Sequence, residues 1–326
     1  MNSALFPSAL RPLAARATSH RLSAVDGEAR SHDAAGNATS IGSKAFTYND
    51  ANRMNAVKQG NAVLESYGYN HRGERVLRTP GSGAAQITLY DEAGQWLGNY
   101  SATGQAQQQA IWLDNYPVAL MNTPATGVPE LAYVQPDHLG TPRVVIDPVR
   151  DVAIWEWSNK SEVFGNQIPS ADPDGDGVAF ELALRFPGQQ ATDASGLFYN
   201  YQREYDPAVG RYSQSDPIGL LGGIASFAYV GGNPISQSDS LGLCEDDNGS
   251  DAPIHQKTYG KYFKSCMSYV QPPTWLTLPV SGASVLTLFV EVPFVAGVAT
   301  VGGGALASYE VGAAIVCAMA GIQTLQ

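Results

Sequence analysis

A tyrosine that recurs at a fixed spacing constrains the fold of this chain more than any other feature of its sequence. Pairs of Tyr with Asn or Asp occur at an interval of 21 residues, at Tyr48-Asn49, Tyr69-Asn70 and Tyr90-Asp91. Four residues after each tyrosine stands a residue that tolerates a positive φ and can turn the chain, namely Asn52, Gly73 and Gly94. Each unit is therefore predicted to be one β-hairpin. Because a hairpin cannot bury its apolar face alone, successive hairpins should pair edge to edge into a curved β shell.

The same character extends beyond the three units. The 34 glycines and 20 prolines separate short β-branched and aromatic runs, which is typical of many short strands joined by turns. Residues 32–37, with Asp33 and Gly36, are predicted to be a degenerate earlier unit. With 326 residues, 44% of them hydrophobic, the chain is long enough to bury a large core. Its first part should be all-β.

A series of short motifs follows the repeats. In chain order they are Asp137-His138-Leu139-Gly140-Thr141-Pro142-Arg143, Trp155-Glu156-Trp157, Phe164-Gly165, Leu184-Arg185-Phe186-Pro187-Gly188-Gln189, Gly196-Leu197-Phe198-Tyr199-Asn200, Tyr205-Asp206-Pro207, Gly210-Arg211-Tyr212, Asp216-Pro217-Ile218-Gly219-Leu220, and Tyr229 with Asn233-Pro234. Each motif alone is weak evidence, but together and in this order they resemble the RHS and YD-repeat proteins. The resemblance covers about residues 30 to 243.

This resemblance implies a mainly β fold with a fixed organisation. An N-terminal remnant (1–29) would precede YD-repeat hairpins (30–136) that form a β shell, and an RHS core (137–243) would close it. A variable, toxin-like C-terminal segment (244–326) would follow. Members of this family are usually far longer, so the chain is expected to correspond to the C-terminal part of a polymorphic toxin.

The resemblance also implies a role in bacterial competition, as a secreted effector. The expected partners are a secretion-system spike or delivery domain, a cognate immunity protein and the membrane of the target cell, and no cofactor is expected. The first 20 residues contain no unbroken apolar stretch before a small-residue cleavage site, so export without a signal peptide is expected.

RHS cores of this type are thought to cleave themselves after a motif of the form PxxxxDPxGL. Here Pro234 begins a matching stretch that ends in Gly242 and Leu243, which implies cleavage of the bond between Leu243 and Cys244. The stretch beginning at Asp216 echoes the motif, with the family's spacing to Asp239. We therefore assign Asp216 and Asp239 as a catalytic pair.

Two carboxylates held close together share a proton, so that one can activate water while the other polarises the scissile carbonyl. The alternative is that Asp216 and Asp239 only form Asx-turns beside glycine. One residue departs from the family pattern, because Ser240 stands where proline is usual. Serine loosens the loop and adds competing hydrogen bonds, so slower cleavage is expected.

A second acidic group has the start of a calcium-loop pattern. Asp172, Asp174 and Asp176 place oxygens at alternate positions before Gly177, but Ala183 stands where such a loop needs a bidentate acid. A solvated turn is therefore favoured over a calcium site, and no metal is assigned.

The composition changes after Leu243. Beyond Leu276 the only charged side chains are Glu291 and Glu310, and apolar stretches of near-helical length alternate with proline and glycine. A mostly α, membrane-inserting and pore-forming hairpin is expected. Small residues recur at every fourth position and would let helices approach closely in lipid; they are Ala296, Thr300, Gly304, Ser308 and Gly312. The alternatives are a buried helical pair in a small soluble domain and an inactive remnant.

Two other classes of function remain. An enzymatic toxin needs a catalytic constellation, yet the segment after Leu243 has one histidine, His255, and no arginine. The net charge of −11 does not favour nucleic-acid binding, which requires a basic surface. The third class is an inert structural shell fragment.

The cysteines, Cys244, Cys266 and Cys317, are expected to be buried thiols, with a disulfide between two of them as the alternative.

Overall fold

The computed structural model describes residues 13–15, 19–124, 127–160, 162–219 and 224–243. The chain divides into two compact units, of which the first comprises residues 1–254 and Gln326 and contains every described residue. The second unit, residues 255–325, lies outside the described residues. So does the whole segment 244–326 for which a mostly α structure is expected.

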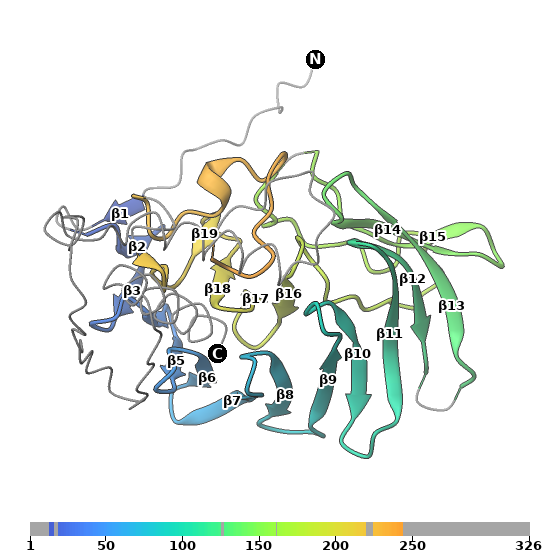
Figure 1. Ribbon diagram of the computed structural model, residues 1–326, viewed down its shortest axis with the longest axis horizontal. Helices are drawn as coiled ribbons and strands as arrows, with labels where there is room; N and C mark the ends of the chain where they lie inside the picture. The colour runs from blue at the N-terminus through green and yellow to red at the C-terminus, as the bar shows by residue number, and fades with distance from the viewer. Residues whose placement is uncertain (1–12, 16–18, 125–126, 161, 220–223, 244–326) are drawn as a thin grey trace, which may run out of the picture. The chain divides into compact units, whose positions relative to one another are not determined.

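The described part is mainly β, as the sequence predicts. Fifteen strands form one antiparallel sheet in which each strand pairs with its neighbours in sequence, so their spatial order is the chain order (Figure 1). We call this sheet the wall. Its strands are β1 (Leu13–Ala15), β2 (Leu22–Val25), β3 (Glu28–His32), β4 (Ala38–Ile41), β5 (Lys44–Tyr48), β6 (Met54–Gln59), β7 (Ala62–Tyr69), β8 (Arg75–Pro80), β9 (Gln86–Tyr90), β10 (Trp96–Ser101), β11 (Ala106–Leu113), β12 (Tyr116–Asn122), β13 (Glu130–Pro136), β14 (Pro142–Asp147) and β15 (Val152–Glu156).

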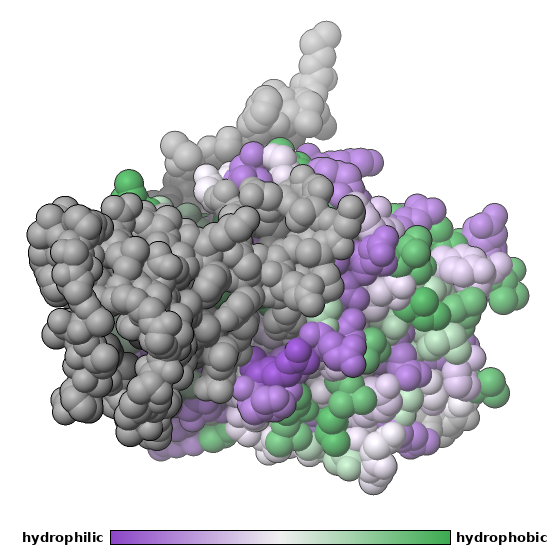
Figure 2. Space-filling model, in the orientation of Figure 1, coloured by the Kyte–Doolittle hydropathy of each residue, from purple (hydrophilic) through white to green (hydrophobic). Residues whose placement is uncertain are grey.

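The wall strands bury one face and expose the other. In β13, Ala132 and Val134 are buried in the core, whereas Leu131 and Tyr133 between and beside them are 39% and 50% exposed. This alternation follows from the period of two along a strand. Figure 2 shows apolar and polar residues interspersed on the visible surface, as on most protein surfaces.

The repeat forms the turns that were predicted. Tyr48, Tyr69 and Tyr90 end β5, β7 and β9, and the residues four positions later adopt φ values of +58°, +79° and +82°. The Asn or Asp side chain after each tyrosine accepts the backbone N–H four residues further on, at 2.9, 3.0 and 2.8 Å. Asp33 accepts the N–H of Asn37 in the same way, which confirms the degenerate earlier unit.

The tyrosine hydroxyls connect successive units. Each donates to the carbonyl oxygen of the residue that begins the strand after the preceding turn, over distances of 2.8, 2.6 and 3.3 Å; the pairs are Tyr48 with Ala38, Tyr69 with Met54, and Tyr90 with Arg75. We call this series the tyrosine ladder. It gives each buried hydroxyl a partner and fixes the position of one hairpin against the next.

Side chains of a second, four-stranded sheet pack into the same hydrophobic core as the buried face of the wall. It contains β16 (Gln190–Thr192), β17 (Leu197–Asn200), β18 (Arg203–Asp206) and β19 (Arg211–Tyr212), and the short 3-10 helix η2 (Val230–Gly232) follows. Every residue of β17 and β18 is buried. Other parts of the protein therefore cover both faces of these two strands, and we call the four-stranded sheet the inner sheet.

Aromatic side chains of the wall and the inner sheet share one hydrophobic core. Trp155 from β15 and Trp157 just after it are 2% and 1% exposed. The Trp157 ring lies 5.3 Å from that of Phe186 and 6.3 Å from that of Phe198. The motifs recognised in the sequence are thus largely core residues, and they hold the inner sheet against the wall. Among the described residues, no helix is long and apolar enough to cross a membrane.

Candidate functional site

Asp216 lies in the loop after β19. Its backbone N–H donates to the carbonyl oxygen of Ser226 at 2.8 Å, and its carboxylate Oδ1 accepts the N–H of Ile218 at 3.0 Å. The latter contact is an Asx-turn, the local role considered as the alternative for this residue. The side chain is nevertheless buried, and its second carboxylate oxygen, Oδ2, contacts Arg203.

Asp239 is buried more deeply and accepts hydrogen bonds from three separate residues. Its Oδ2 accepts the Tyr212 hydroxyl at 2.7 Å and the Arg203 Nη2 at 3.1 Å, and its Oδ1 accepts the backbone N–H of Leu243 at 2.9 Å. The residue is 2% exposed. The carboxylate thus holds the backbone of the residue that precedes the expected cleavage point.

One arginine joins the two aspartates. The guanidinium of Arg203, in β18, contacts Asp216 Oδ2 through Nη1 at 3.0 Å and Asp239 Oδ2 through Nη2 at 3.1 Å. Its Nε donates to the carbonyl oxygen of Gly242 at 2.6 Å. The structure therefore brings the two predicted residues to one buried cation, which also binds the cleavage motif.

Burial dominates the electrostatics of this site. It raises the pKa of Asp216 to about 6, a shift that the positive charge of Arg203 and the N–H of Ile218 oppose and the charge of Asp239 reinforces. One member of the pair can therefore bind a proton near neutral pH while Arg203 compensates the remaining charge. This is the electrostatic requirement of an acid–base pair of carboxylates.

The sequence reasoning missed Arg203. The sequence does hold a signal, because Arg203 interrupts an aromatic-rich stretch that runs from Phe198 to Tyr205 and that is expected to be buried. A buried guanidinium needs hydrogen-bond or charge partners, and it can bind two carboxylates through separate edges.

The cleavage motif packs closely on the inner sheet. Gly242 adopts φ +68°, and a Cβ atom at this position would collide with the carbonyl oxygen of Asn200. Pro234 and Leu243 are buried. The glycine of the motif is thus needed for the close approach that lets Arg203 reach its carbonyl group. Cys244 lies outside the described residues, and so do the small residues of the expected helix-association face, Ala296, Thr300, Gly304, Ser308 and Gly312.

A second glycine supports the same loop. Gly188 belongs to one of the sequence motifs and has φ +80°, and a Cβ atom there would collide with the main chain of Ser240. Ser240, which replaces the usual proline, is itself buried. The sequence reasoning did not connect Gly188 with the cleavage motif, although its place beside proline marked a tight turn.

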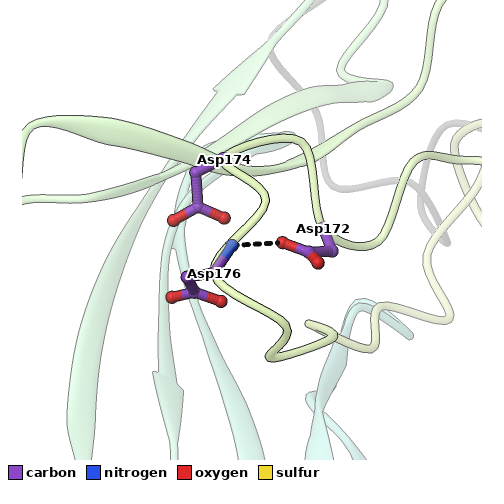
Figure 3. A group of neighbouring side chains, drawn as sticks. All are labelled: Asp172, Asp174 and Asp176. Carbon is purple, nitrogen blue, oxygen red and sulfur yellow. Dashed lines mark hydrogen bonds between the residues drawn. The ribbon is translucent and has the colours of Figure 1, made fainter.

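The acidic group at 172–176 forms a capped turn (Figure 3). The Asp172 carboxylate accepts the backbone N–H groups of Asp176 and Gly177, each at 3.1 Å. The three carboxylates lie close enough to bind one ion, but Arg150 contacts Asp174 at 2.6 Å and Asp176 at 2.7 Å. A turn that carries a surface ion pair accounts for these residues.

Comparison with curated proteins finds several relatives of this chain. No family model matches the chain. The toxin protein Tse5 of Pseudomonas aeruginosa is 34% identical over 138 residues, which are 42% of this chain and 10% of Tse5. The probable deoxyribonuclease RhsA of Dickeya dadantii is 29% identical over 210 residues, which are 61% of this chain and 14% of RhsA.

A solved structure has a similar fold. In the crystal structure of TcdB2-TccC3 without its hypervariable C-terminal region, the similarity covers 72% of this chain and 12% of that chain, with a TM-score of 0.54 and 22% sequence identity. The chain thus spans only a small part of the length of each of these three proteins.

Proposed function

The chain belongs to the RHS and YD-repeat family of polymorphic toxins, and we propose on this premise that it cleaves itself once, between Leu243 and Cys244. Cleavage would separate the β shell from the C-terminal segment 244–326, the effector of a toxin used in bacterial competition. Tse5 is named as a toxin and RhsA as a probable deoxyribonuclease, and both are much longer than this chain.

The observation that carries the proposal is the set of contacts made by Arg203. One guanidinium binds Asp216, Asp239 and the Gly242 carbonyl group, at 3.0, 3.1 and 2.6 Å. Asp239 in turn accepts the N–H of Leu243. Both carboxylates and the residues just before the Leu243–Cys244 bond are therefore held together by charge-assisted hydrogen bonds, which are the stronger kind.

The reaction is a peptide hydrolysis. One aspartate, in its ionised form, takes a proton from water, and the water oxygen bonds to the carbonyl carbon of Leu243. The other aspartate donates its proton to the carbonyl oxygen. When the intermediate collapses, the C–N bond breaks, Leu243 keeps the new carboxyl group and the nitrogen of Cys244 gains a proton.

The proposed partners follow from the family. A delivery domain or secretion-system spike would carry the protein out of the producing cell, and an immunity protein would protect that cell. The expected site of action of the C-terminal segment is the membrane of the target cell, because its sequence between Leu276 and Gln326 is almost uncharged.

Intact-mass analysis of the purified full chain tests self-cleavage. Wild type should yield fragments 1–243 and 244–326, whereas Asp216→Asn and Asp239→Asn should each remain whole, because an amide can neither take nor supply the proton. Asp206→Asn is the matched control, since Asp206 is a buried aspartate of the inner sheet that pairs with Arg30 at 2.6 Å rather than with Arg203. This variant should still cleave.

The pH dependence provides a second measurement. Because burial raises the pKa of Asp216 to about 6, the pair should hold its proton below that pH and lose it above. Cleavage of the refolded chain should therefore slow as the pH rises through about 6. A wild-type chain that stays whole from acidic to neutral pH would refute self-cleavage.

A further inference from the structure

A buried hydrogen-bonded chain continues from Asp239 into the inner sheet. Asn200, at the end of β17, donates through Nδ2 to the Tyr212 hydroxyl at 2.7 Å and to the backbone carbonyl of Asp239 at 2.9 Å. The Tyr212 hydroxyl, in β19, lies 2.7 Å from Asp239 Oδ2. Asn200 is fully buried and Tyr212 is 1% exposed. The self-cleavage reaction described above uses neither side chain as acid or base.

Asn200 fixes the direction of the tyrosine hydroxyl. The backbone carbonyl of Asp239 can only accept a hydrogen bond, so the nitrogen of the Asn200 amide must face it. The same nitrogen donates to the hydroxyl oxygen of Tyr212. The hydroxyl hydrogen is then directed away from Asn200 and toward the Asp239 carboxylate.

Tyr212 also contacts the cation of the site. The guanidinium of Arg203 lies 3.6 Å from the centre of the Tyr212 ring. The ring face thus supports Arg203 while the hydroxyl binds Asp239, so one side chain positions two members of the site.

We propose that Tyr212, oriented by Asn200, is a positioning residue that keeps Asp239 ionised, which makes Asp239 the base of the pair and Asp216 the acid. The inference rests on the proposed self-cleavage and assigns the roles within that reaction. Neither Tyr212 nor Asn200 is required to touch the scissile bond.

The hydrogen bonds of the two carboxylates differ in the way that the assignment of Asp239 as base and Asp216 as acid requires. Asp239 accepts from a hydroxyl, a guanidinium and a backbone N–H, whereas the contacts described for Asp216 come from the guanidinium and one N–H in its own turn. Donors stabilise the ionised form of a carboxyl group. Among the described residues, the charged or titratable groups that the contacts place against Asp239 are Arg203 from β18 and Tyr212 from β19, together with Asp216 across the guanidinium.

The protonation of Tyr212 supports its role as a donor. Burial, reinforced by the negative charge of Asp239, raises the pKa of Tyr212 well above its usual value. The hydroxyl therefore keeps its proton throughout the pH range in which the aspartates titrate.

Tyr212→Phe isolates the hydroxyl, because the ring that supports Arg203 remains. Tyr205→Phe is a closely matched control: Tyr205 is fully buried, its ring centre lies 6.0 Å from that of Tyr212, and its hydroxyl donates to the Phe164 carbonyl at 2.6 Å. Each substitution removes one buried hydroxyl from the same aromatic cluster. Only the first removes a donor to a carboxylate.

The measurement is the rate of self-cleavage after refolding, followed by intact mass from pH 4 to pH 9, with thermal unfolding of each full chain beside it. Tyr212→Phe should cleave about tenfold more slowly at the wild-type optimum, and the acidic limb of its profile should move up by roughly one pH unit. The sign follows because loss of a donor disfavours the ionised form of Asp239, which must lose its proton to act as base. Asn200→Leu should shift the limb in the same direction.

Tyr205→Phe should lower the unfolding temperature without moving the limb. The inference is overturned if wild type cleaves and the Tyr212→Phe profile coincides with it, or if Tyr205→Phe produces the same shift as Tyr212→Phe. A wild-type chain that fails to cleave at any pH instead rejects the proposed function itself, so the two failures are distinguishable.

Discussion

Single residues decide how closely the loop that carries the proposed cleavage motif approaches the inner sheet. Gly242 and Gly188 both have positive φ, and a side chain at either position would collide with main-chain atoms, of Asn200 and Ser240 respectively. Two close backbone approaches thus hold the loop on which Asp239 stands. The site depends on these approaches because the carbonyl of Gly242 binds Arg203 directly.

Gly188→Ala should displace the loop. The new methyl group would overlap the main chain of Ser240, so we expect a loss of stability of about 2 kcal/mol or more and little or no cleavage. Gly104→Ala is the control, because Gly104 has φ +83°, close to the +80° of Gly188, and open space where the methyl group would stand. It should show the cost of the backbone strain alone, about 1 kcal/mol, with cleavage unchanged. Thermal unfolding and intact mass measure both effects, and equal results for the two variants would contradict this explanation.

The sequence predicted part of this site at the residue scale. Asp216 and Asp239 were identified through their motifs, and the structure places both on Arg203. Arg203 and Tyr212 were not identified, because contacts that cross between strands depend on sheet register, which spacing along the chain does not reveal. Gly188 was missed for the same reason, since it meets Ser240 only in the folded chain.

At the scale of elements, the tyrosine ladder explains why the repeat needs tyrosine and not only an aromatic ring. The ring fills the space between hairpins, and the hydroxyl satisfies a carbonyl group of the preceding unit. The turn after each tyrosine was predictable, because Asn and Gly are the residues that tolerate its φ. The hydroxyl contacts were not, because they join units whose relative placement only pairing decides.

Tyr69→Phe should remove one rung of the ladder and leave the packing of the ring intact. The carbonyl oxygen of Met54 would lose a partner at 2.6 Å, so the free energy of unfolding should fall by about 1 kcal/mol. Tyr133→Phe is the control, since Tyr133 is 50% exposed on the outer face and its change should stay within about 0.5 kcal/mol. Denaturant titration compares the two. A Tyr69→Phe chain as stable as the control would show that the ladder does not contribute to stability.

At the scale of the described unit, ties across long stretches of sequence hold the inner sheet to the wall. Arg30 pairs with Asp206 at 2.6 Å, and the backbone N–H of Arg75 donates to the Tyr199 hydroxyl at 2.9 Å. The guanidinium of Arg75 also lies over the rings of Tyr67 and Tyr199. The tyrosine repeat predicted the wall, where neighbours in sequence are neighbours in space. It could not predict these ties, because nothing local in the sequence records them.

The last prediction concerns residues 244–326, whose structure lies outside the described residues. Expressed without the shell, this segment should depolarise a bacterial inner membrane and release dye from lipid vesicles. Beyond Leu276 it carries only Glu291 and Glu310 as charged side chains, and a carboxylate in hydrocarbon costs about 2.5 kcal/mol or more. Each glutamate should therefore face a partner helix or a water-filled lumen. Glu310→Gln should change the ion preference of the pore more than insertion, because a carboxylate lining a lumen favours cations.

A matched pair of substitutions separates helix association from simple hydrophobicity. Gly304→Leu enlarges a residue of the small-residue face formed by Ala296, Thr300, Gly304, Ser308 and Gly312, whereas Gly302→Leu adds the same side chain two residues away, on the opposite side of a helix. Both changes add equal apolar surface, so both should favour insertion equally. Only Gly304→Leu should reduce leakage, because it separates helices that must pack to form a pore. Equal leakage from the two variants would refute the association face, and a soluble segment that leaves vesicles and membrane potential intact would refute the pore.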